Sequence, residues 1–549
     1  MGRVEGHGGN LAVAVAREHG VDAMFTLSGA HVFPLYDGAV HADPPMRLVD
    51  VRHEQTAVFA AEAMAKLTRR PGLAALTAGP GVTNGVSAIA TAHFNGSPLL
   101  VVGGRAPTHR WGTGSLQEID HPPLVAPITK HAGTIPAVGD IVSGVDDALR
   151  VAENPHRGPV FLDVPMDQLY SRAEAELPPP GQQVREEPAP AALAGVGALL
   201  ADAERPVVVL GSDVWTDGAE EAARRAVEEL RVPVVANGMG RGVLPSGHEL
   251  LVTPARSAAF GRADLVIVVG APLDFRLGFG EFGGQGDTPK ARVAHLVDAP
   301  DQVATHVDLD GSAAGDLSLV LGGLVAAHAK HPTRGYDEWL DELHDSAHAR
   351  ADADVELLRS DADPIHPGRI YGELLRLLDD DAVIVGDGGD FVSFAGRWVE
   401  PKRPGHWLDP GPYGCLGTGL GYAAAARLAH PQSQVVLLLG DGAAGMSLMD
   451  VDTLVRHRLP VVIVCGNNGA WGLEKHPMRF LYGYDVAADL QQGTRYDEVA
   501  RALGAEGELV TKPGEIGRAL RRAFNAGAPY LVNIATDPEA AYPRSTTGI

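Results

Sequence analysis

The chain has 549 residues, of which 45% are hydrophobic, so it is long enough to fill several cores, and we expect two to four domains. Acidic residues outnumber basic ones by 69 to 45, and the formal net charge of -24 disfavours nucleic acid and anionic membranes as partners. Two cysteines, no signal-peptide core and no apolar run near 18 residues predict a cytoplasmic protein without a membrane partner.

The first third of the chain contains four polar segments that are candidates for chemistry. Taken alone, each has a plain structural interpretation: a packing histidine, a carboxylate exposed on a helix face, a tight turn that glycines permit, and a polar loop. In chain order they are Ser28–His31 (SGAH), Arg52–Gln55 (RHEQ), Thr77–Asn84 (TAGPGVTN) and Ser115–Glu118 (SLQE).

Two breaks in composition divide the chain. Residues 171–195 are rich in Pro and charge and predict an exposed linker, and residues 329–364 predict a helical, solvated connector. Between them, apolar runs at 206–210, 233–236 and 265–269 alternate with helical segments. We therefore predict an α/β fold with three doubly wound parallel-sheet domains, spanning residues 1–172, 195–328 and 362–545.

The third domain carries the most specific spacing in the sequence. Residues 434–439 form an apolar run typical of a buried parallel strand, and Gly440-Asp441-Gly442 follows it. Residues 446–456 predict a helix and residues 459–464 a second strand, and Asn467-Asn468 follows Gly442 after 24 intervening residues. A strand–helix–strand unit places Asp441 and Asn468 at neighbouring strand ends, where open α/β sheets bind ligands. Their oxygens, with phosphate oxygens, suit Mg²⁺.

A second Gly-Asp-Gly serves as an internal control for this spacing. Gly386-Asp387-Gly388 also follows an apolar run, at residues 382–385. Position 413, where the first Asn would fall, is Tyr, and no Asn pair lies at the required offset. The spacing therefore favours the site at Asp441 over the one at Asp387.

Together these motifs resemble those of the thiamine diphosphate enzymes in the acetolactate synthase, oxalyl-CoA decarboxylase and 2-hydroxyacyl-CoA lyase group, over nearly the whole chain. The resemblance implies that Glu54 hydrogen-bonds the aminopyrimidine ring of the cofactor and promotes the imino tautomer that generates the ylid. It also implies that the turn containing Gly79, Pro80 and Asn84 lies against the pyrimidine.

The same resemblance assigns the diphosphate end of the cofactor. Leu416, in Gly414–Gly419 (GCLGTG), matches the residue that supports the bent cofactor, and Asp441, Asn468 and the carbonyl of Ala470 match the Mg²⁺ ligands. Asp390 and Phe391 match diphosphate contacts, although the family often has Asn, Gln or His at position 390. The predicted cofactor-binding set also includes Gly440, Gly442, Ala443 and Trp471.

The substrate is predicted from smaller similarities. His31 is placed to relay a proton and Gln117 to donate a hydrogen bond to the substrate carbonyl, so both join Glu54 as catalytic candidates. Residues 445–450 and 407–409 resemble the lyases, which implies reversible cleavage of a 2-hydroxyacyl-CoA to formyl-CoA and an aldehyde or ketone. The alternatives are acetolactate synthase, which condenses two 2-keto acids with loss of CO₂, and a noncatalytic homologue of the fold.

Family members bind the two ends of the cofactor with domains of different subunits, which implies a homodimer or homotetramer. Arg241, Arg276 and Asp298 lie in middle-domain segments that resemble nucleotide contacts. The arginines suit phosphates and the aspartate suits a ribose hydroxyl, so this domain is expected to hold ADP or FAD, or to be an empty relic of such a site.

Overall fold

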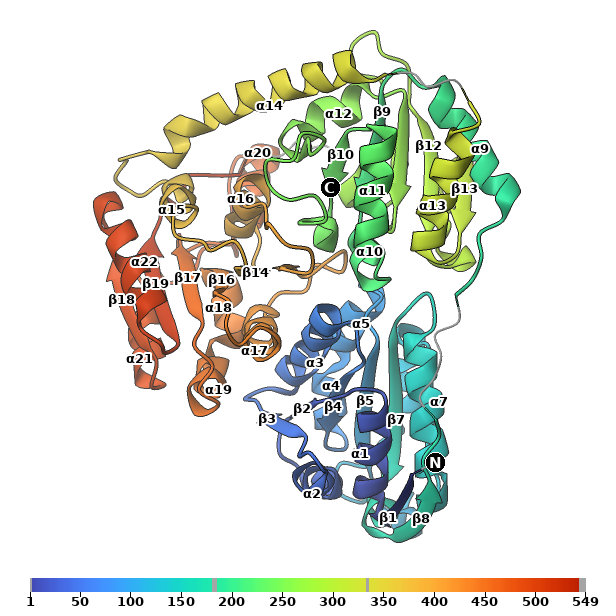
Figure 1. Cartoon of the computed structure of the whole chain (residues 1–549). Helices are drawn as coiled ribbons and strands as arrows, with labels where there is room; N and C mark the ends of the chain where they lie inside the picture. The colour runs from blue at the N-terminus through green and yellow to red at the C-terminus, as the bar shows by residue number, and fades with distance from the viewer. Residues whose placement is uncertain (1, 180–184, 332–334, 543–549) are drawn as a thin grey trace.

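The computed structural model describes residues 2–179, 185–331 and 335–542. It contains three parallel sheets with helices on their faces, which confirms the predicted α/β class with three parallel-sheet domains (Figure 1). The domain boundaries stay a prediction, and residues 180–184 of the predicted linker and 543–545 of the predicted third domain lie outside the described residues.

The N-terminal sheet has the strand order β3-β2-β4-β5-β7-β6. Its strands are β2 (Ala23–Thr26), β3 (Arg47–Asp50), β4 (Gly72–Leu76), β5 (Leu99–Arg105), β6 (His131–Thr134) and β7 (Pro159–Pro165). The helices around it include α1 (Gly8–Glu18), α2 (Phe33–His41), α3 (Glu54–Thr68), α4 (Pro80–Asn84), α5 (Val86–Phe94) and α7 (Ile141–Glu153). Strands β4 and β7 are buried along their whole length, as expected of central strands covered on both faces.

Part of the predicted linker is instead a strand. Residues Arg172–Glu176 form β8, which pairs antiparallel with β1 (Arg3–His7) at the start of the chain. The alternating exposure of β8 marks it as a surface strand, so its polar composition resembles that of a linker. The pairing holds the first and last parts of the N-terminal domain together.

The middle sheet has the order β10-β9-β11-β12-β13. Its strands are β9 (Pro206–Leu210), β10 (Val234–Ala236), β11 (Leu265–Val269), β12 (Arg292–Val297) and β13 (Gly311–Ala314), and its helices include α9 (Pro190–Asp202), α10 (Ser212–Thr216), α11 (Glu220–Leu230), α12 (Arg256–Arg262) and α13 (Leu317–His328). The predicted strands at 206–210 and 265–269 have the observed bounds, because fully buried parallel strands are continuous apolar runs.

The connector after the middle sheet is largely one long helix, α14 (Asp337–Leu358), which crosses from the middle to the C-terminal domain at the top of Figure 1. Its first turns bury Trp339 and Leu343 in the middle core. Near its end, Asp354 forms an ion pair with Arg397 of α16 (Asp390–Trp398). The helix therefore links the two domains directly.

The C-terminal sheet has the order β15-β14-β16-β17-β19-β18. Its strands are β14 (Val383–Asp387), β15 (Trp407–Leu408), β16 (Val435–Gly440), β17 (Val462–Asn467), β18 (Glu506–Val510) and β19 (Tyr530–Ala535). Besides α16, its helices include α15 (Pro367–Leu374), α17 (Gly419–Ala429), α18 (Asp441–Ser447), α19 (Val451–Arg456), α20 (Gly472–Tyr482), α21 (Tyr496–Ala502) and α22 (Ile516–Asn525).

The single helix predicted over residues 446–456 is wrong in detail. Helix α18 begins directly at Asp441, and a 3-10 turn at Leu448–Asp450 separates it from α19. The break occurs where the Asp450 carboxylate accepts a hydrogen bond from the Thr56 hydroxyl of α3 at 2.7 Å. The contact joins two domains, so a periodic pattern within one segment does not predict it.

Helices α3 and α17 form the main contact between the N-terminal and C-terminal domains. Glu62 of α3 is completely buried there, and its carboxylate accepts hydrogen bonds from the Tyr422 hydroxyl at 2.8 Å and from Asn95 Nδ2 at 2.7 Å. Such a buried, fully bonded carboxylate fixes the relative placement of the two helices. Within the described part of the chain, no helix is both long and apolar enough to cross a membrane.

Candidate active site

The ends of β16 and β17 meet as the sequence predicts. The two strands pair in parallel with Gly440 opposite Gly466, so Asp441 and Asn468 follow neighbouring strand ends. The Asp441 carboxylate accepts a hydrogen bond from the backbone N–H of Gly469 at 2.8 Å, and Asn468 Oδ1 accepts one from the N–H of Ala470 at 3.1 Å. Asp441 is therefore in direct contact with the loop that carries Asn468 and Ala470.

The environment of Asp441 suits a cation. Its side chain is only 3% exposed, and burial raises its pKa to about 6, although hydrogen bonds from the backbone of Gly469 and Gly442 act in the opposite direction. None of the ion pairs found among the described residues includes Asp441. A buried carboxylate beside Asn468, with no cationic partner among the described residues, fits Mg²⁺, and its role as a ligand stays a prediction.

A cavity of about 450 Å³ opens at these strand ends. Its glycines permit close approach: a Cβ at Gly442 would lie 2.5 Å from the Trp471 ring, and one at Gly466 would lie 2.5 Å from the Phe391 ring. The cavity brings together every residue predicted to bind the diphosphate end of the cofactor, namely Asp390, Phe391, Leu416, Gly440, Asp441, Gly442, Ala443, Asn468, Ala470 and Trp471. The residues present therefore fit thiamine diphosphate.

Asp390, the departure from the family pattern, begins helix α16 and is 8% exposed. Its carboxylate accepts a hydrogen bond from the backbone N–H of Tyr542 at 2.9 Å. This bond attaches the last described residues of the chain to the wall of the cavity. The predicted contact of Asp390 with diphosphate is not tested by this arrangement and stays a prediction.

The control motif at Asp387 has a different role. Asp387 is completely buried, and its two carboxylate oxygens accept hydrogen bonds from the backbone of Gly417 at 3.0 Å and of Gly419 at 2.8 Å. It therefore holds the loop that presents Leu416 to the cavity. No local pattern marks this role, because Asp387 and Gly417 are 30 residues apart in the sequence.

The residues predicted for the pyrimidine end gather in the N-terminal domain. Glu54 is the first residue of α3, is 7% exposed, and accepts a hydrogen bond from Asn84 Nδ2 at 3.0 Å. Gly79 precedes Pro80 with a φ of +60°, and a Cβ there would lie 2.9 Å from both the side chain and the carbonyl of Gln117. The turn, Gln117 and the Glu54–Asn84 pair thus belong to one end of the N-terminal sheet.

A buried histidine that the sequence analysis missed supports this turn. His121 Nε2 accepts a hydrogen bond from the N–H of Gly79 at 2.9 Å, so the ring proton resides on Nδ1 and is donated to Asp163, 3.0 Å away. His121 and Asp163 are both completely buried. Since 42 residues separate them, no short motif marks the pair.

His31 lies beside this arrangement. Its Nδ1 is 3.0 Å from the Thr77 hydroxyl, and the side chain is buried. Burial, together with the nearby His121, lowers the pKa of His31. The imidazole is therefore neutral at physiological pH, which is the state that accepts a proton.

Asp450 anchors the start of α3 and was also missed. Its carboxylate accepts hydrogen bonds from the backbone N–H of Arg52 at 2.8 Å and from the hydroxyls of Thr56 and Thr453 at 2.7 and 2.8 Å. These bonds tie the segment immediately before Glu54 to the C-terminal domain. Arg52 and Thr56 are distant from Asp450 in the sequence, so local patterns do not predict this role.

The two halves of the predicted site do not line one cavity within the chain. The described residues around the 450 Å³ cavity come from the middle and C-terminal domains, and Glu54, Asn84, His31 and Gln117 are not among them. The N-terminal domain reaches the wall of this cavity through other side chains: Asn95 Nδ2 donates to the Pro410 carbonyl at 3.5 Å, and Lys66 Nζ donates to the Asp409 carbonyl at 3.4 Å.

The three residues predicted to bind a nucleotide are all engaged by protein partners. Arg241 donates to the Glu400 carboxylate at 2.7 Å, Arg276 pairs with Asp274 at 2.7 Å, and Asp298 lies 3.0 Å from His156. In this arrangement they offer a nucleotide little free hydrogen-bonding capacity. The presence of ADP or FAD stays a prediction.

Binding of Mg²⁺ with thiamine diphosphate is expected to weaken below about pH 6. The raised pKa of Asp441 means that a proton competes with the cation, so affinity falls by up to about tenfold per pH unit below this value. The same shift lowers the stability of the metal-free protein as pH rises from 3.8 to about 6, because folding must then protonate a carboxylate that is ionised in the unfolded chain. Mg²⁺ titrations at saturating cofactor, corrected for protonation of the free diphosphate, test this, and an affinity independent of pH contradicts it.

Comparison with known protein families covers each of the three domains. The "Thiamine pyrophosphate enzyme, N-terminal TPP binding domain" model matches residues 6–124, the central-domain model residues 193–324, and the C-terminal TPP binding domain model residues 387–534. The cavity at Asp441 lies within the C-terminal match and Glu54 within the N-terminal one.

Similar proteins align with nearly the whole chain. A "Probable acetolactate synthase" of Mycobacterium bovis is 50% identical over 545 residues, covering 98% of this chain and 97% of the relative. The "2-hydroxyacyl-CoA lyase 2" of Homo sapiens is 34% identical over 575 residues, covering 96% and 90%, and that of Caenorhabditis elegans is 34% identical, covering 92% and 84%. With the site geometry and three matching domains, the chain belongs to the thiamine pyrophosphate enzyme family.

Proposed function

We propose that this enzyme reversibly cleaves a 2-hydroxyacyl-CoA into formyl-CoA and an aldehyde or ketone, using thiamine diphosphate and Mg²⁺. In this reaction the bond between the hydroxyl-bearing carbon and the thioester carbonyl carbon breaks. The hydroxyl group loses its proton and becomes the carbonyl of the aldehyde or ketone, and one proton is added to the thioester carbonyl carbon to give formyl-CoA. When bound, thiamine diphosphate supplies a carbon nucleophile for the substrate carbonyl.

The observation that carries this choice is the pairing of the arginines in the cavity. Among the described lining residues, the cationic side chains are Arg241 and Arg276, and each is paired with a carboxylate, Glu400 and Asp274 respectively. A 2-keto acid brings a carboxylate that requires an available cation. A thioester has no charge at its reacting end, so it suits a cavity whose arginines are already neutralised.

The chain's own residues then have distinct roles. Asp441, Asn468 and the carbonyl of Ala470 hold Mg²⁺ and with it the diphosphate, while Leu416 supports the cofactor from the side. Glu54 holds and returns a proton at the aminopyrimidine ring. The neutral imidazole of His31 accepts the proton of the 2-hydroxyl group, and Gln117 donates a hydrogen bond to the carbonyl oxygen.

We further propose that the active unit is at least a homodimer. The cavity around Asp441 lacks the pyrimidine-side residues of its own chain, so Glu54 of the partner subunit would complete it. Apolar side chains near both halves are exposed, including Leu116 at 79% and Met446 at 53%. Burial of such side chains against a second copy accounts for their exposure in one chain.

Acetolactate synthase is the second candidate, favoured by the 50% identity to the "Probable acetolactate synthase" of Mycobacterium bovis. In that reaction two 2-keto acids condense and CO₂ leaves. It requires that Arg276 exchange Asp274 for a substrate carboxylate.

One experiment separates the two candidates. The purified enzyme with thiamine diphosphate and Mg²⁺ is incubated with a short 2-hydroxyacyl-CoA and, separately, with pyruvate, and the products are identified by mass spectrometry. We expect formyl-CoA and an aldehyde from the first incubation. Acetolactate from the second, with no cleavage of the thioester substrate, overturns the proposal in favour of the alternative.

A further inference from the structure

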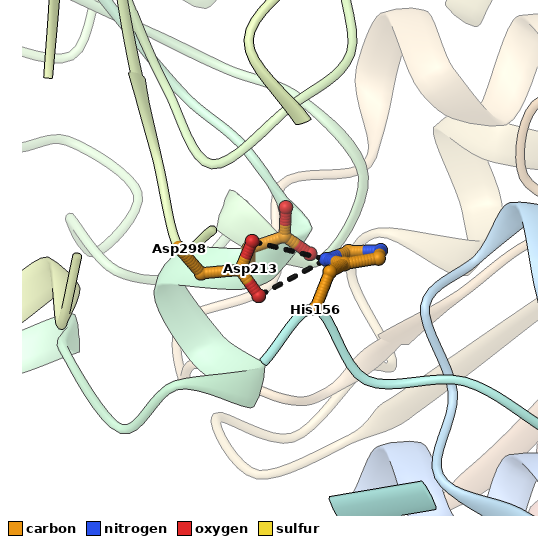
Figure 2. Close-up of side chains that lie close together, drawn as sticks. All are labelled: His156, Asp213 and Asp298. Carbon is orange, nitrogen blue, oxygen red and sulfur yellow. Dashed lines mark hydrogen bonds and ion pairs between the residues drawn. The ribbon is translucent and has the colours of Figure 1, made fainter. Parts of the chain in front are cut away.

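A second cavity, of about 560 Å³, lies between the N-terminal and middle domains and borders a cluster of three titratable side chains. Figure 2 shows the carboxylates of Asp213 and Asp298 beside the imidazole of His156. His156 comes from the loop between α7 and β7, Asp213 from α10 after β9, and Asp298 from the segment after β12. The proposed reaction uses none of these three residues.

The distances within the cluster are those of potential metal ligands. One ligand atom from each residue lies within 4.8 Å of the other two. His156 Nδ1 is 3.0 Å from both carboxylate oxygens of Asp298 (dashed lines in Figure 2). A cation placed among the three atoms would need only small movements to reach normal coordination distances of about 2.0–2.2 Å.

Asp213 provides a second, independent observation. Its side chain is 8% exposed, yet its carboxylate accepts no hydrogen bond from any residue in the described part of the chain. The nearby Arg157 donates from Nη2 to Asp217 at 3.0 Å, and its Nη1 lies 4.0 Å from Asp298, so it forms no hydrogen bond with Asp213. Burying an unbonded carboxylate is costly, and here burial raises the pKa of Asp213 to about 7. This carboxylate therefore has an unmet requirement for a cationic or donor partner.

We propose that His156, Asp213 and Asp298 form a site for a divalent transition-metal cation, with Nδ1 and one oxygen of each carboxylate as ligands. On binding, the cation replaces the proton between His156 and Asp298, which is released to solvent. One imidazole and two carboxylates favour Zn²⁺, Mn²⁺ or Fe²⁺ over Mg²⁺ or Ca²⁺. Water from the adjoining cavity completes the coordination.

The position of this site gives it a structural role. Its ligands come from the N-terminal domain through His156 and from two strand ends of the middle domain through Asp213 and Asp298. A bound cation would hold the two domains together and would stabilise the folded chain by mass action.

The test uses the full chain, treated with a chelator and then dialysed, in the absence of thiamine diphosphate. Binding of Mn²⁺ is followed by electron paramagnetic resonance and binding of Zn²⁺ by calorimetry, and thermal unfolding is recorded with and without each cation. We expect one such cation per chain and a higher Tm when it is bound. Asp213→Asn should weaken binding by at least about tenfold and remove the rise in Tm.

Three further variants keep the test decisive. Asp298→Asn should behave like Asp213→Asn, which covers the case in which one variant folds poorly. Asp301→Asn removes the same charge from the wall of the same cavity but outside the cluster, so it should bind like the wild type. Asp441→Asn should also bind normally, which separates this site from the proposed active site. Absence of binding in the wild type, or unchanged binding in Asp213→Asn, overturns the proposal.

Discussion

Replacing Glu54 by Gln is expected to lower turnover by at least about 10³-fold, because the amide cannot hold and return the proton at the aminopyrimidine ring. The substitution keeps an oxygen that accepts the hydrogen bond from Asn84, so the fold should be preserved. Steady-state kinetics at saturating thiamine diphosphate and Mg²⁺ measure the effect on kcat.

Glu174→Gln is a matched control for this variant, since it makes the same chemical change on an exposed strand of the same domain. It should retain wild-type turnover, and both variants should have the wild-type Tm. A Glu54→Gln enzyme that keeps more than about a tenth of wild-type kcat would contradict the assigned role of Glu54.

Replacing Asp441 by Asn is expected to abolish Mg²⁺-dependent binding of thiamine diphosphate. The change removes the charge of the buried carboxylate at the end of β16, which we infer to be the main protein ligand of the metal. In the wild type, saturating cofactor and Mg²⁺ should raise Tm, by an amount that grows with cofactor concentration. The Asn variant should show no rise.

Asp387→Asn provides a close control for Asp441→Asn. Each of the two carboxylates follows a glycine at a strand end and accepts hydrogen bonds from two backbone N–H groups. An Asn side chain has only one accepting oxygen, so each variant loses about one such bond. Leaving the buried donor unpaired costs roughly 1–3 kcal/mol of stability. Their unliganded proteins should therefore be destabilised similarly. If Asp387→Asn loses the response to Mg²⁺ and Asp441→Asn keeps it, the metal site has been assigned to the wrong strand end.

The part of the fold that the sequence predicts well is the part determined by local patterns. The strands at 206–210 and 265–269 are uninterrupted apolar runs, and the spacing between Asp441 and Asn468 follows from one strand–helix–strand unit. The start of α18 at Asp441 was not predicted, since its glycines and alanines carry no amphipathic pattern.

The supporting residues could not be predicted because their partners are distant in sequence. His121 acts on Gly79 and Asp163, and Asp450 reaches the start of α3 from another domain. Arg241, in contrast, was predicted to bind a ligand and instead contacts another part of the protein. Its motif resembles a phosphate contact, but its guanidinium is held by Glu400 of the C-terminal domain, which only the folded chain brings close.

The central claim is that Glu54 of one subunit and Asp441 of another act in the same site, and mixing the two inactive variants tests it most directly. Glu54→Gln and Asp441→Asn chains are dissociated, combined in equal amounts and reassembled. Random pairing makes half of the dimers hybrids, each with one intact site of two, so we predict recovery of about a quarter of wild-type activity. Recovery of no activity, from variants shown to form hybrid dimers, would contradict the shared site.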